Sequence, residues 1–171
     1  MSTDPYVFLA RRSLETYITT RKMMEVPDDL CPELLDRQAG AFVSLHKNDD
    51  LRGCIGTIAP TTASIAEEII RNAVRAAVAD PRFPEVTPDE LPFITINVDV
   101  LGEIEDISSP DELDIKRYGV IVRNGFRTGL LLPDLDGITS VDQQIRIAKL
   151  KAGIAPSESV ELQRFEVVRH T

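Results

Sequence analysis

The stretch of the chain that decides the fold is Gly40-Ala41-Phe42-Val43-Ser44-Leu45-His46, then Lys47-Asn48-Asp49-Asp50, then Leu51-Arg52-Gly53-Cys54-Ile55-Gly56-Thr57. In its first part, Ala41, Val43 and Leu45 occupy every second position, which predicts a strand. The polar residues that follow form a turn, so the second part is expected to return antiparallel to the first. The sequence therefore predicts a β-hairpin at this place.

The returning strand carries a cysteine between two glycines. Arg52 and Cys54 are two positions apart, and such residues project from the same face of an extended strand, roughly 7 Å apart. A nearby guanidinium lowers the pKa of a thiol below its usual value of about 8.5, because it stabilises the reactive thiolate. The pattern therefore predicts an activated Cys54. The alternative is that Cys54 is a small buried hydrophobe.

Gly53 and Gly56 flank this cysteine. Because they have no side chains, a ligand or another strand can approach the backbone closely at these positions, which makes both glycines candidates for substrate binding. The alternative is that they mark only a bulge or tight packing.

The length of the turn decides what faces Cys54. A turn of two or four residues places Val43 opposite Cys54, whereas a three-residue loop with a bulge places Ser44 opposite Cys54 and His46 opposite Arg52. The sequence leaves both registers open. Ser44 is therefore a candidate substrate contact in the second register.

Each of the two histidines is a candidate base for Cys54, since a neighbouring imidazole often activates a cysteine nucleophile. His46 is near the site by sequence, and the alternative is that it is solvated beside the turn. His170 reaches the site only if a C-terminal strand from Val160 to Arg169 returns to it, and the alternative is a frayed terminus.

A second candidate segment is Asp80-Pro81-Arg82-Phe83-Pro84, in which two prolines hold the backbone around a charge and an aromatic ring. In one interpretation Asp80 accepts hydrogen bonds at a helix end and pairs with Arg82. In the other, Arg82 lines a pocket beside Cys54, with Asp80 and Phe83 as further contacts. Arg52 and Arg82 together would suit a small anion, a carboxylate or a single phosphate.

Asn72 lies in an alanine-rich segment that is predicted to be helical. It either hydrogen-bonds a buried backbone group or orients a ligand. The sequence does not distinguish these two roles.

Other periodic segments complete the predicted fold. They are a helix from residue 5 to about 24 after Asp4, a helix capped by Thr61 or Thr62 that ends before Pro81, a strand over 94–100, a connection over 106–112, a hairpin at Asn124-Gly125, and a helix from Ser140 to Gly153. Strands outnumber helices and mostly pair as hairpins. This predicts an α+β fold with a mixed, mainly antiparallel sheet, flanked by helices and with a small second lobe.

Composition predicts one compact domain. The chain has 171 residues, 43% of them hydrophobic, which is enough for a substantial core. The two cysteines, Cys31 and Cys54, and the absence of a secretory pattern at the start suggest a reducing cytoplasm, although a disulfide between the two is the alternative. No apolar run approaches the roughly 20 residues of a membrane helix.

Charge and motifs narrow the function classes. A net charge of −9 disfavours broad nucleic-acid binding, which relies on clusters of basic residues. The sequence contains no phosphate-binding loop, dinucleotide fingerprint or paired-cysteine metal motif, so we expect no cofactor and no metal.

Segments along nearly the whole chain are similar, in order, to signature blocks of the AMMECR domain family. Besides the hairpin and residues 80–84, they are Asn72-Ala73, Ala76-Ala77, Gly119-Val120, Gly129-Leu130-Leu131-Leu132-Pro133, Lys151-Ala152-Gly153-Ile154 and Arg164-Phe165-Glu166-Val167. The resemblance implies the same α+β arrangement. It also implies partners, a Memo-type protein and a radical S-adenosylmethionine protein. The chain departs from the common pattern at Glu85, where a proline often stands, and it has no tryptophan.

Two classes of function follow from these observations. In the first, Cys54 is the nucleophile of an enzyme, Arg52 lowers its pKa or holds an anionic substrate, and a histidine moves protons. In the second, the same pocket binds a ligand or a peptide end without catalysis, and the protein serves a partner enzyme. Regulation through nucleic acid is a third and less favoured class.

Overall fold

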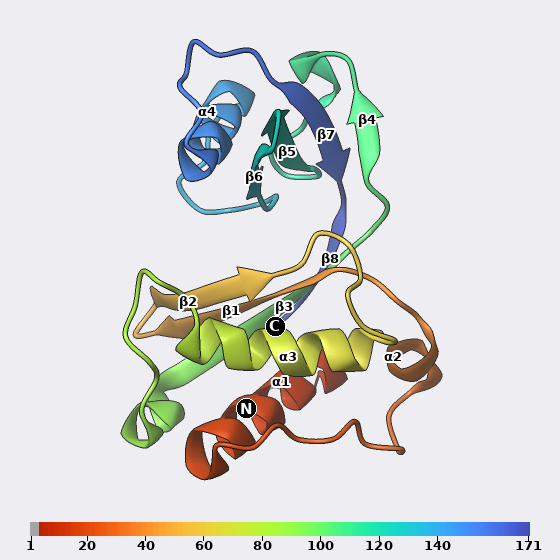
Figure 1. Cartoon of the computed structure of the whole chain (residues 1–171), viewed down its shortest axis with the longest axis vertical. Helices are drawn as coiled ribbons and strands as arrows, with labels where there is room; N and C mark the ends of the chain where they lie inside the picture. The colour runs from red at the N-terminus through yellow and green to blue at the C-terminus, as the bar shows by residue number, and fades with distance from the viewer. Residues whose placement is uncertain (1–3) are drawn as a thin grey trace. The chain divides into compact units, whose positions relative to one another are not determined.

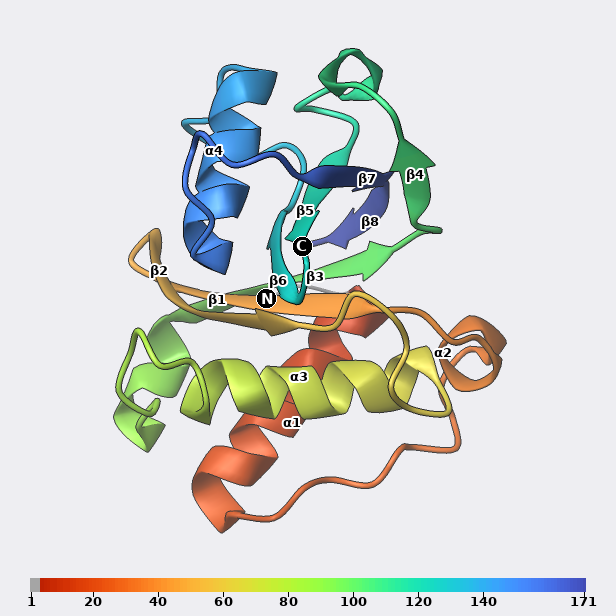
Figure 2. The same ribbon diagram turned by 45° about the horizontal axis from the view of Figure 1, so that its top comes forward.

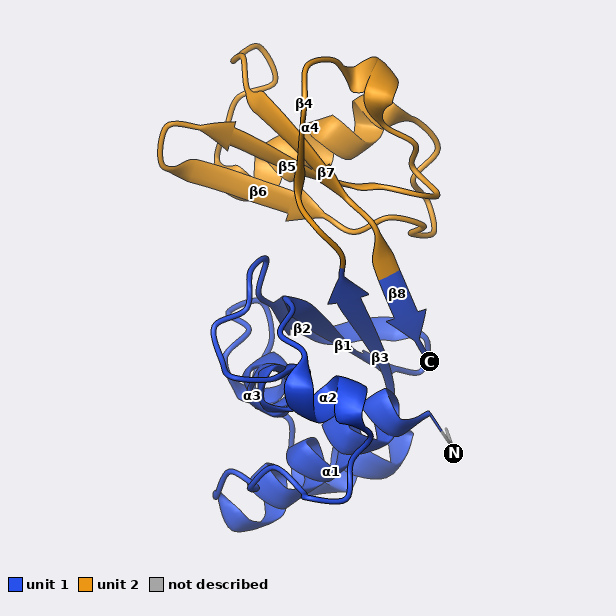
Figure 3. Ribbon diagram, turned by 90° about the vertical axis from the view of Figure 1, so that its right-hand side faces the viewer, with its two compact units in different colours: residues 1–101, 168–171 blue, residues 102–167 orange. Residues whose placement is uncertain are grey.

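The computed structural model describes residues 4–171, which divide into two compact units (Figure 3). Unit 1 comprises residues 4–101 and 168–171, and unit 2 comprises residues 102–167. The chain thus leaves unit 1 once and returns to it only with its last residues.

Unit 1 is built on a four-stranded sheet with the order β2-β1-β3-β8. The strands are β1 (Ala41–Lys47), β2 (Asp50–Gly56), β3 (Ile94–Leu101) and β8 (Val167–His170). β1 pairs antiparallel with both β2 and β3. β2 and β8 are consequently the two opposite edges of this sheet.

Two long helices, α1 (Pro5–Thr20) and α3 (Ile65–Val78), cover one face of the sheet of unit 1 (Figures 1 and 2). A short helix, α2 (Pro32–Asp36), and a 3₁₀ helix, η1 (Pro88–Phe93), lie in the connections. The apolar stripes of α1 and α3 pack on inward-facing strand residues such as Val43. This burial of the stripes is what holds helices and sheet together.

The helix α1 ends earlier than the sequence predicts, at Thr20 instead of residue 24. Asp4 caps its first turn as expected, since the carboxylate accepts from the backbone N–H of Tyr6 and Val7. At the other end Arg21 takes a left-handed conformation, with φ 60°, and donates its N–H to the carbonyl of Tyr17. A left-handed residue stops a helix, and the apolar periodicity does not reveal it.

The cap of α3 is Ser64, whose hydroxyl accepts from Glu67 N at 3.2 Å, and not Thr61 or Thr62. Thr61 instead donates its hydroxyl to the buried carboxylate of Glu68 at 2.7 Å. The helix ends at Val78, before Pro81, as predicted.

Unit 2 has its own four-stranded sheet, with the order β4-β7-β5-β6. The strands are β4 (Glu105–Ile107), β5 (Gly119–Asn124), β6 (Arg127–Leu131) and β7 (Glu161–Phe165), and neighbouring strands pair antiparallel. A 3₁₀ helix, η2 (Pro110–Glu112), follows β4. The connection predicted over 106–112 therefore contains part of a strand and a helical turn.

The helix α4 (Val141–Ala152) packs on β5 and β6 and closes the core of unit 2. Its ends agree with the sequence: Ser140 accepts from Gln143 N at 3.1 Å, and Gly153 takes a left-handed conformation with φ 70°. Between β5 and β6 the turn consists of Gly125 and Phe126, one residue later than the Asn-Gly pair predicts.

The predicted C-terminal strand from Val160 to Arg169 is wrong as a single element. It is two strands, β7 and β8, and they belong to different sheets. Glu166 lies between them, and its carbonyl accepts from Gly102 N at 2.8 Å. The α+β class is confirmed, with two antiparallel sheets flanked by helices, and the second lobe is unit 2.

Candidate functional site

The register of the hairpin combines features of both sequence alternatives. Ser44 lies opposite Cys54, as the bulged register predicts, but His46 does not lie opposite Arg52. The paired positions are Ser44 with Cys54, Leu45 with Gly53, and His46 with Leu51. Arg52 is therefore the extra residue of a β-bulge.

The turn of this hairpin has two residues, Asn48 and Asp49, and both have positive φ, 53° and 67°. Two left-handed residues are the mark of a tight hairpin turn, and asparagine and aspartate tolerate that conformation better than most residues. The predicted link between a bulge and a three-residue loop is wrong, because here the bulge accompanies a two-residue turn.

Ser44 and Cys54 form the centre of the candidate site. Ser44 Oγ lies 3.3 Å from Cys54 Sγ, and either atom can be the donor. Ser44 is buried, with 7% of its surface exposed, whereas Cys54 is half-buried. Since Val43 and Leu45 point into the core with the helices, alternation places Ser44 and Cys54 on the opposite face of the sheet.

The segment after α3 brings a carboxylate and a guanidinium to the same place. The Asp80 carboxylate accepts from the backbone N–H of Cys54 at 3.0 Å. Arg82 donates to both oxygens of that carboxylate, from Nε at 3.0 Å and from a terminal nitrogen at 2.8 Å. The Asp80 side chain is 3% exposed and the Arg82 side chain 50% exposed. Both predicted roles of this segment are thus compatible, since one ion pair lies beside Cys54.

The charges of this group influence one another. The pKa of Asp80 is lowered to about 2, chiefly by its side-chain hydrogen bond with Arg82, although burial opposes this shift. The pKa of Arg82 is raised, first by the hydrogen bond to Asp80 and in smaller part by the charges of Asp80 and Cys54. The charge of Cys54 is thus among the causes of the raised Arg82 pKa, so the guanidinium lies within electrostatic range of the thiol.

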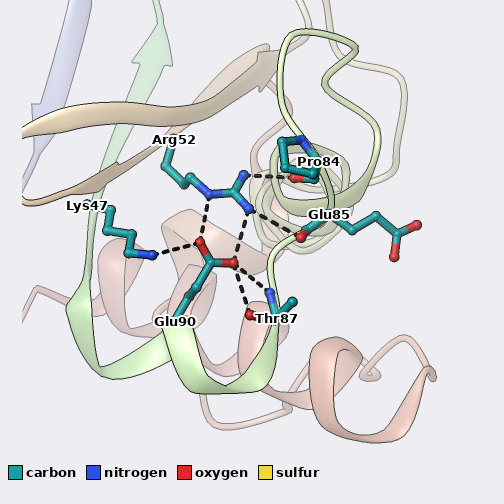
Figure 4. Close-up of polar contacts among 6 residues, drawn as sticks. All are labelled: Lys47, Arg52, Pro84, Glu85, Thr87 and Glu90. Carbon is teal, nitrogen blue, oxygen red and sulfur yellow. Dashed lines mark hydrogen bonds and ion pairs between the residues drawn. The ribbon is translucent and has the colours of Figure 1, made fainter.

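Arg52 takes a different place from the one that its sequence position predicts (Figure 4). Its guanidinium bonds both carboxylate oxygens of Glu90, at 2.9 and 3.0 Å. It also donates to the carbonyls of Pro84 and Glu85, at 2.8 and 3.2 Å. Only 12% of the Arg52 side chain is exposed. Arg52 thus fastens the connection between α3 and β3 to β2, whereas Arg82 interacts electrostatically with Cys54.

Glu90 is the residue of this cluster that the sequence reasoning missed. Besides Arg52, it accepts from Lys47 at 3.0 Å and from the backbone N–H of Thr87 at 2.8 Å (Figure 4). The pair Thr87 and Glu90 forms a capping box on η1, and this spacing was available in the sequence as a signal. The pKa of Glu90 is lowered to about 2, mainly by its hydrogen bond with Arg52.

We expect acid to destabilise unit 1 through these two carboxylates. Asp80 and Glu90 have folded pKa values of about 2, below their ordinary values of 3.8 and 4.5. A lowered folded pKa contributes stability above the ordinary value, and this is lost as pH falls from about 4.5 through about 2. The free energy of unfolding, measured by urea denaturation at each pH, should therefore decrease over this window.

The Glu90→Gln variant should show a shallower acid dependence than the wild type. Glu15→Gln provides the control, because the Glu15 side chain is half-exposed and forms a surface ion pair with Arg11 at 3.4 Å. If the free energy of unfolding decreased equally steeply with falling pH in wild type and in Glu90→Gln, the lowered pKa of Glu90 would be contradicted.

Gly53 and Gly56 are explained by packing within unit 1. A Cβ on Gly53 would lie 2.1 Å from the carbonyl oxygen of Ala76 in α3. A Cβ on Gly56 would lie 2.2 to 2.4 Å from ring atoms of Phe42. The space at both positions is thus filled by the protein, as in the alternative of tight packing, and their predicted contact with a substrate is not supported by this geometry.

Asn72 and Phe83 have defined places in unit 1. Asn72 is fully buried and donates to the carbonyl of Ala41 at 2.9 Å and to Thr57 Oγ1 at 3.3 Å. This is the backbone role among its two predicted roles. Phe83 is half-buried beside Arg82, whose guanidinium carbon lies 5.4 Å from the ring centre.

One of the two histidines, His170, lies far from the thiol in strand order, whereas His46 is on β1, next to the strand of Cys54. His170 is on β8, the edge opposite to β2, so three inter-strand spacings of about 4.8 Å separate the strands. Its Nδ1 lies 2.8 Å from the Asp4 carboxylate, and its ring stacks on Tyr6 at 3.8 Å. The C-terminal strand therefore joins the same sheet but does not bring His170 to Cys54. His46 is half-buried opposite Leu51.

The arrangement can hold an anion beside a thiol. Ser44 offers a hydroxyl, Arg82 a half-exposed guanidinium, and Cys54 a sulfur atom that both can reach electrostatically or by hydrogen bond. Among residues 4–171, no group of three histidine, cysteine, aspartate or glutamate side chains is arranged to hold a metal ion. Cys31 and Cys54 are not joined by a disulfide.

None of the helices between residues 4 and 171 combines the length and the apolar character that crossing a bilayer requires.

Comparison with known proteins gives one family. The family model AMMECR1 matches residues 7–170. A protein of Thermotoga maritima is 52% identical over 168 residues, which are 97% of each chain. A protein of Clostridium acetobutylicum is 53% identical over 168 residues, and there this chain spans only 36% of the relative's length. A protein of Thermococcus gammatolerans is 39% identical over 162 residues, 88% of this chain and 78% of the other.

A solved structure is similar over nearly the whole chain. It is the crystal structure of an uncharacterized protein from Pyrococcus horikoshii, with a TM-score of 0.89 and 34% identity. The match covers 96% of this chain and 88% of the other. Since the family model matches residues of both units and the Thermotoga maritima protein is 52% identical over 97% of each chain, this chain belongs to the AMMECR1 family.

Proposed function

We propose that this protein binds a small molecule beside Cys54 through an anionic group, a carboxylate or a single phosphate, and that the Cys54 thiolate attacks an electrophilic carbon elsewhere in that molecule, forming a carbon–sulfur bond as the leaving group departs with its electron pair. The observation that carries the proposal is the position of Arg82. Its guanidinium is paired with Asp80, lies close enough to Cys54 to interact with its charge, and is half-exposed. Arg82 thus pairs with the Asp80 carboxylate and also interacts with the charge of the Cys54 thiolate.

Arg82 has capacity left for a ligand. Nε and one terminal nitrogen bond Asp80, and the other N–H donors of the guanidinium have no partner among residues 4–171. Asp80 fixes the plane of the guanidinium, which reduces the entropy that a bound anion must offset. The prolines on both sides hold the segment in place.

The other end of the ligand would lie near Ser44 and Cys54. The Ser44 hydroxyl can donate to an anionic oxygen or to the thiolate, since its contact with Sγ can run either way. A hydrogen bond to the charged form stabilises a thiolate in the same direction as Arg82 does. Arg52 is a positioning residue in this scheme, because it fixes the connection that carries Asp80 and Arg82 against β2.

The competing function is binding without catalysis, as an accessory module for a partner enzyme. It is favoured by the place of His170, which is engaged with Asp4 and Tyr6 at the far edge of the sheet. A nucleophilic cysteine commonly has a base beside it. We propose Memo-type and radical S-adenosylmethionine proteins as the partners in this case. Cys54→Ser would then leave partner binding intact, whereas it would abolish a thiol reaction.

We expect the pH midpoint of Cys54 alkylation by iodoacetamide to shift in opposite directions in two variants. Arg82→Ala removes the cation and leaves the Asp80 carboxylate beside the thiol, so the midpoint should rise. Asp80→Asn removes the negative charge, so the midpoint should fall. Mass spectrometry of the Cys54 peptide gives the rate at each pH and separates it from Cys31.

Arg21→Ala is the matched control, since Arg21 forms an exposed ion pair with Glu85 and should leave the midpoint unchanged. A purely structural role for the Asp80 and Arg82 pair would move both variants in the same direction through unfolding. The proposal also requires that acetate or phosphate protect Cys54 from alkylation in the wild type and not in Arg82→Ala. Protection that survives in Arg82→Ala would overturn it.

A further inference from the structure

Unit 2 has a cavity of about 340 Å³ whose lining shares no residue with the Cys54 site. It is formed by β4, β5, β7 and the residues next to them. Its charged and polar lining residues are Asp106, Ser108, Arg123, Glu161 and Gln163. This volume is at the small end of the roughly 300 to 1,000 Å³ that small-molecule sites occupy.

The strand register shows that these polar groups share one face of the sheet. Arg123 lies directly opposite Glu161, and Asp106 lies directly opposite Gln163. Glu161 and Gln163 are two positions apart on β7 and therefore point to the same side. The other face belongs to the core under α4, which includes Val122 and Leu162. The face away from α4 thus carries one cation and two carboxylates in a short row.

The charges in this row are not neutralised by one another. The Arg123 guanidinium has neither an ion pair nor a hydrogen bond with any residue of the described chain, 4–171, although Glu161 is its cross-strand neighbour. Asp106 accepts from Gln163 Nε2 at 2.8 Å, so its position is fixed by β7. Elsewhere in unit 2 the arginines Arg117, Arg127 and Arg164 each pair with a glutamate.

We propose that this cavity binds a small zwitterion of the α-amino acid class. Arg123 would hold the carboxylate, because a guanidinium matches the two oxygens of that group. Asp106 and Glu161 would hold the ammonium group, and Ser108 can accept from it as well. Val160 and Leu162 also line the cavity, but their side chains pack on the core of unit 2, so the ligand would be recognised by its two charges.

A second cavity of about 300 Å³ adjoins this one, and the two share Arg123, Val160 and Glu161. Its remaining lining comes from the β5–β6 turn and Ser159. The charged pair Arg123 and Glu161 thus lies where the two cavities meet. A zwitterion held by this pair has room on both sides for its substituent.

The test is a titration of the full-length protein with leucine, followed by ¹H–¹⁵N NMR. We expect saturable shifts at residues of β4, β5 and β7, with acetate and ethylammonium, the single-charge probes, each binding at least about tenfold more weakly. Arg123→Ala should weaken leucine binding by about tenfold or more. Arg146→Ala, an exposed arginine on α4 of the same unit, should leave it unchanged.

Three results would overturn the proposal. The first is a linear response to leucine without saturation. The second is leucine affinity that is equal in wild type and in an Arg123→Ala variant whose spectrum shows it to be folded. The third is acetate that binds as tightly as leucine, which would make this an anion site. A weakened affinity in Glu161→Gln for leucine but not for acetate would support the role of the carboxylates.

Discussion

Gly53→Ala should be the most damaging single substitution near the candidate site. Gly53 lies in β2, and a Cβ there would lie 2.1 Å from the carbonyl oxygen of Ala76 and 3.1 Å from its carbonyl carbon. These are backbone atoms of α3, so relief requires moving the helix away from the sheet. We expect the free energy of unfolding to fall by at least about 3 kcal/mol, at the upper end of overpacking costs. Urea denaturation followed by circular dichroism measures this change.

Gly102→Ala is the matched control for this substitution. Its Cβ would have one neighbour, the carbonyl oxygen of Glu166, at an ordinary 3.4 Å. The expected change is within about 0.5 kcal/mol, as for most sites without a special constraint. If Gly53→Ala were as stable as Gly102→Ala, the close approach of β2 and α3 would be wrong.

Arg52→Ala should have the second largest effect, and the effect should be on stability. The Arg52 and Glu90 side chains are 12% and 13% exposed, so their ion pair is largely shielded from water. Removing Arg52 leaves the Glu90 carboxylate with Lys47 and Thr87, and it leaves two carbonyls, of Pro84 and Glu85, without that donor. Breaking a shielded pair typically costs about 3 kcal/mol or more, and we expect a loss of that size in urea denaturation.

Two comparisons make this prediction specific. Arg21→Ala removes an exposed ion pair with Glu85 and should cost at most about 1 kcal/mol. Arg52→Lys should recover only part of the stability, because an ammonium group cannot reproduce the planar fork that reaches both Glu90 oxygens and the carbonyls. Equal stabilities of Arg52→Ala and Arg21→Ala would show that the network is unimportant.

The arginine of the family signature, Arg52, and the arginine beside Cys54, Arg82, have different partners. In the sequence, Arg52 is two positions from Cys54, and this spacing suggests that it activates the thiol. In the structure, its guanidinium is engaged by Glu90 and two backbone carbonyls, and Arg82 is a cation that interacts with Cys54. The arginine of the signature thus supports the loop that carries the cation of the site.

Local patterns predicted most elements of the fold correctly. The period of two over β1 and β3, the period of 3.6 over α3, and the caps at Asp4, Ser140 and Gly153 depend on neighbours within one turn or one strand. Where the predicted end of an element was wrong, the cause was a contact outside that turn of the chain or a backbone conformation that periodicity does not reveal. Thr61 is not the cap of α3 because its hydroxyl bonds Glu68, and α1 ends early because Arg21 is left-handed.

Which residues lie at the candidate site was easier to predict than how they are arranged. The sequence indicated Asp80 and Arg82 as a pair within one proline-flanked segment, and they do form an ion pair next to Cys54. Which residue faces Cys54 depended on the bulge at Arg52, and a bulge follows from how β2 fits against α3 and the η1 connection. No spacing in the sequence indicated that Glu90, 38 residues further along, would engage Arg52.

The sequence alone was enough to predict the α+β class, the hairpin that carries Cys54, the N-terminal cap of α1, both caps of α4 and the family to which the chain belongs. These features rest on interactions between residues close in the chain, or on signature residues that can be compared directly. Three features followed from the tertiary fold alone: the terminal segment divides between two sheets, His170 lies at the edge opposite to Cys54, and Arg52 pairs with Glu90 while Arg82 pairs with Asp80 beside Cys54. The physical reason is that charge pairing and close packing depend on distances through space between segments that are far apart in the chain, and periodicity carries no information about them.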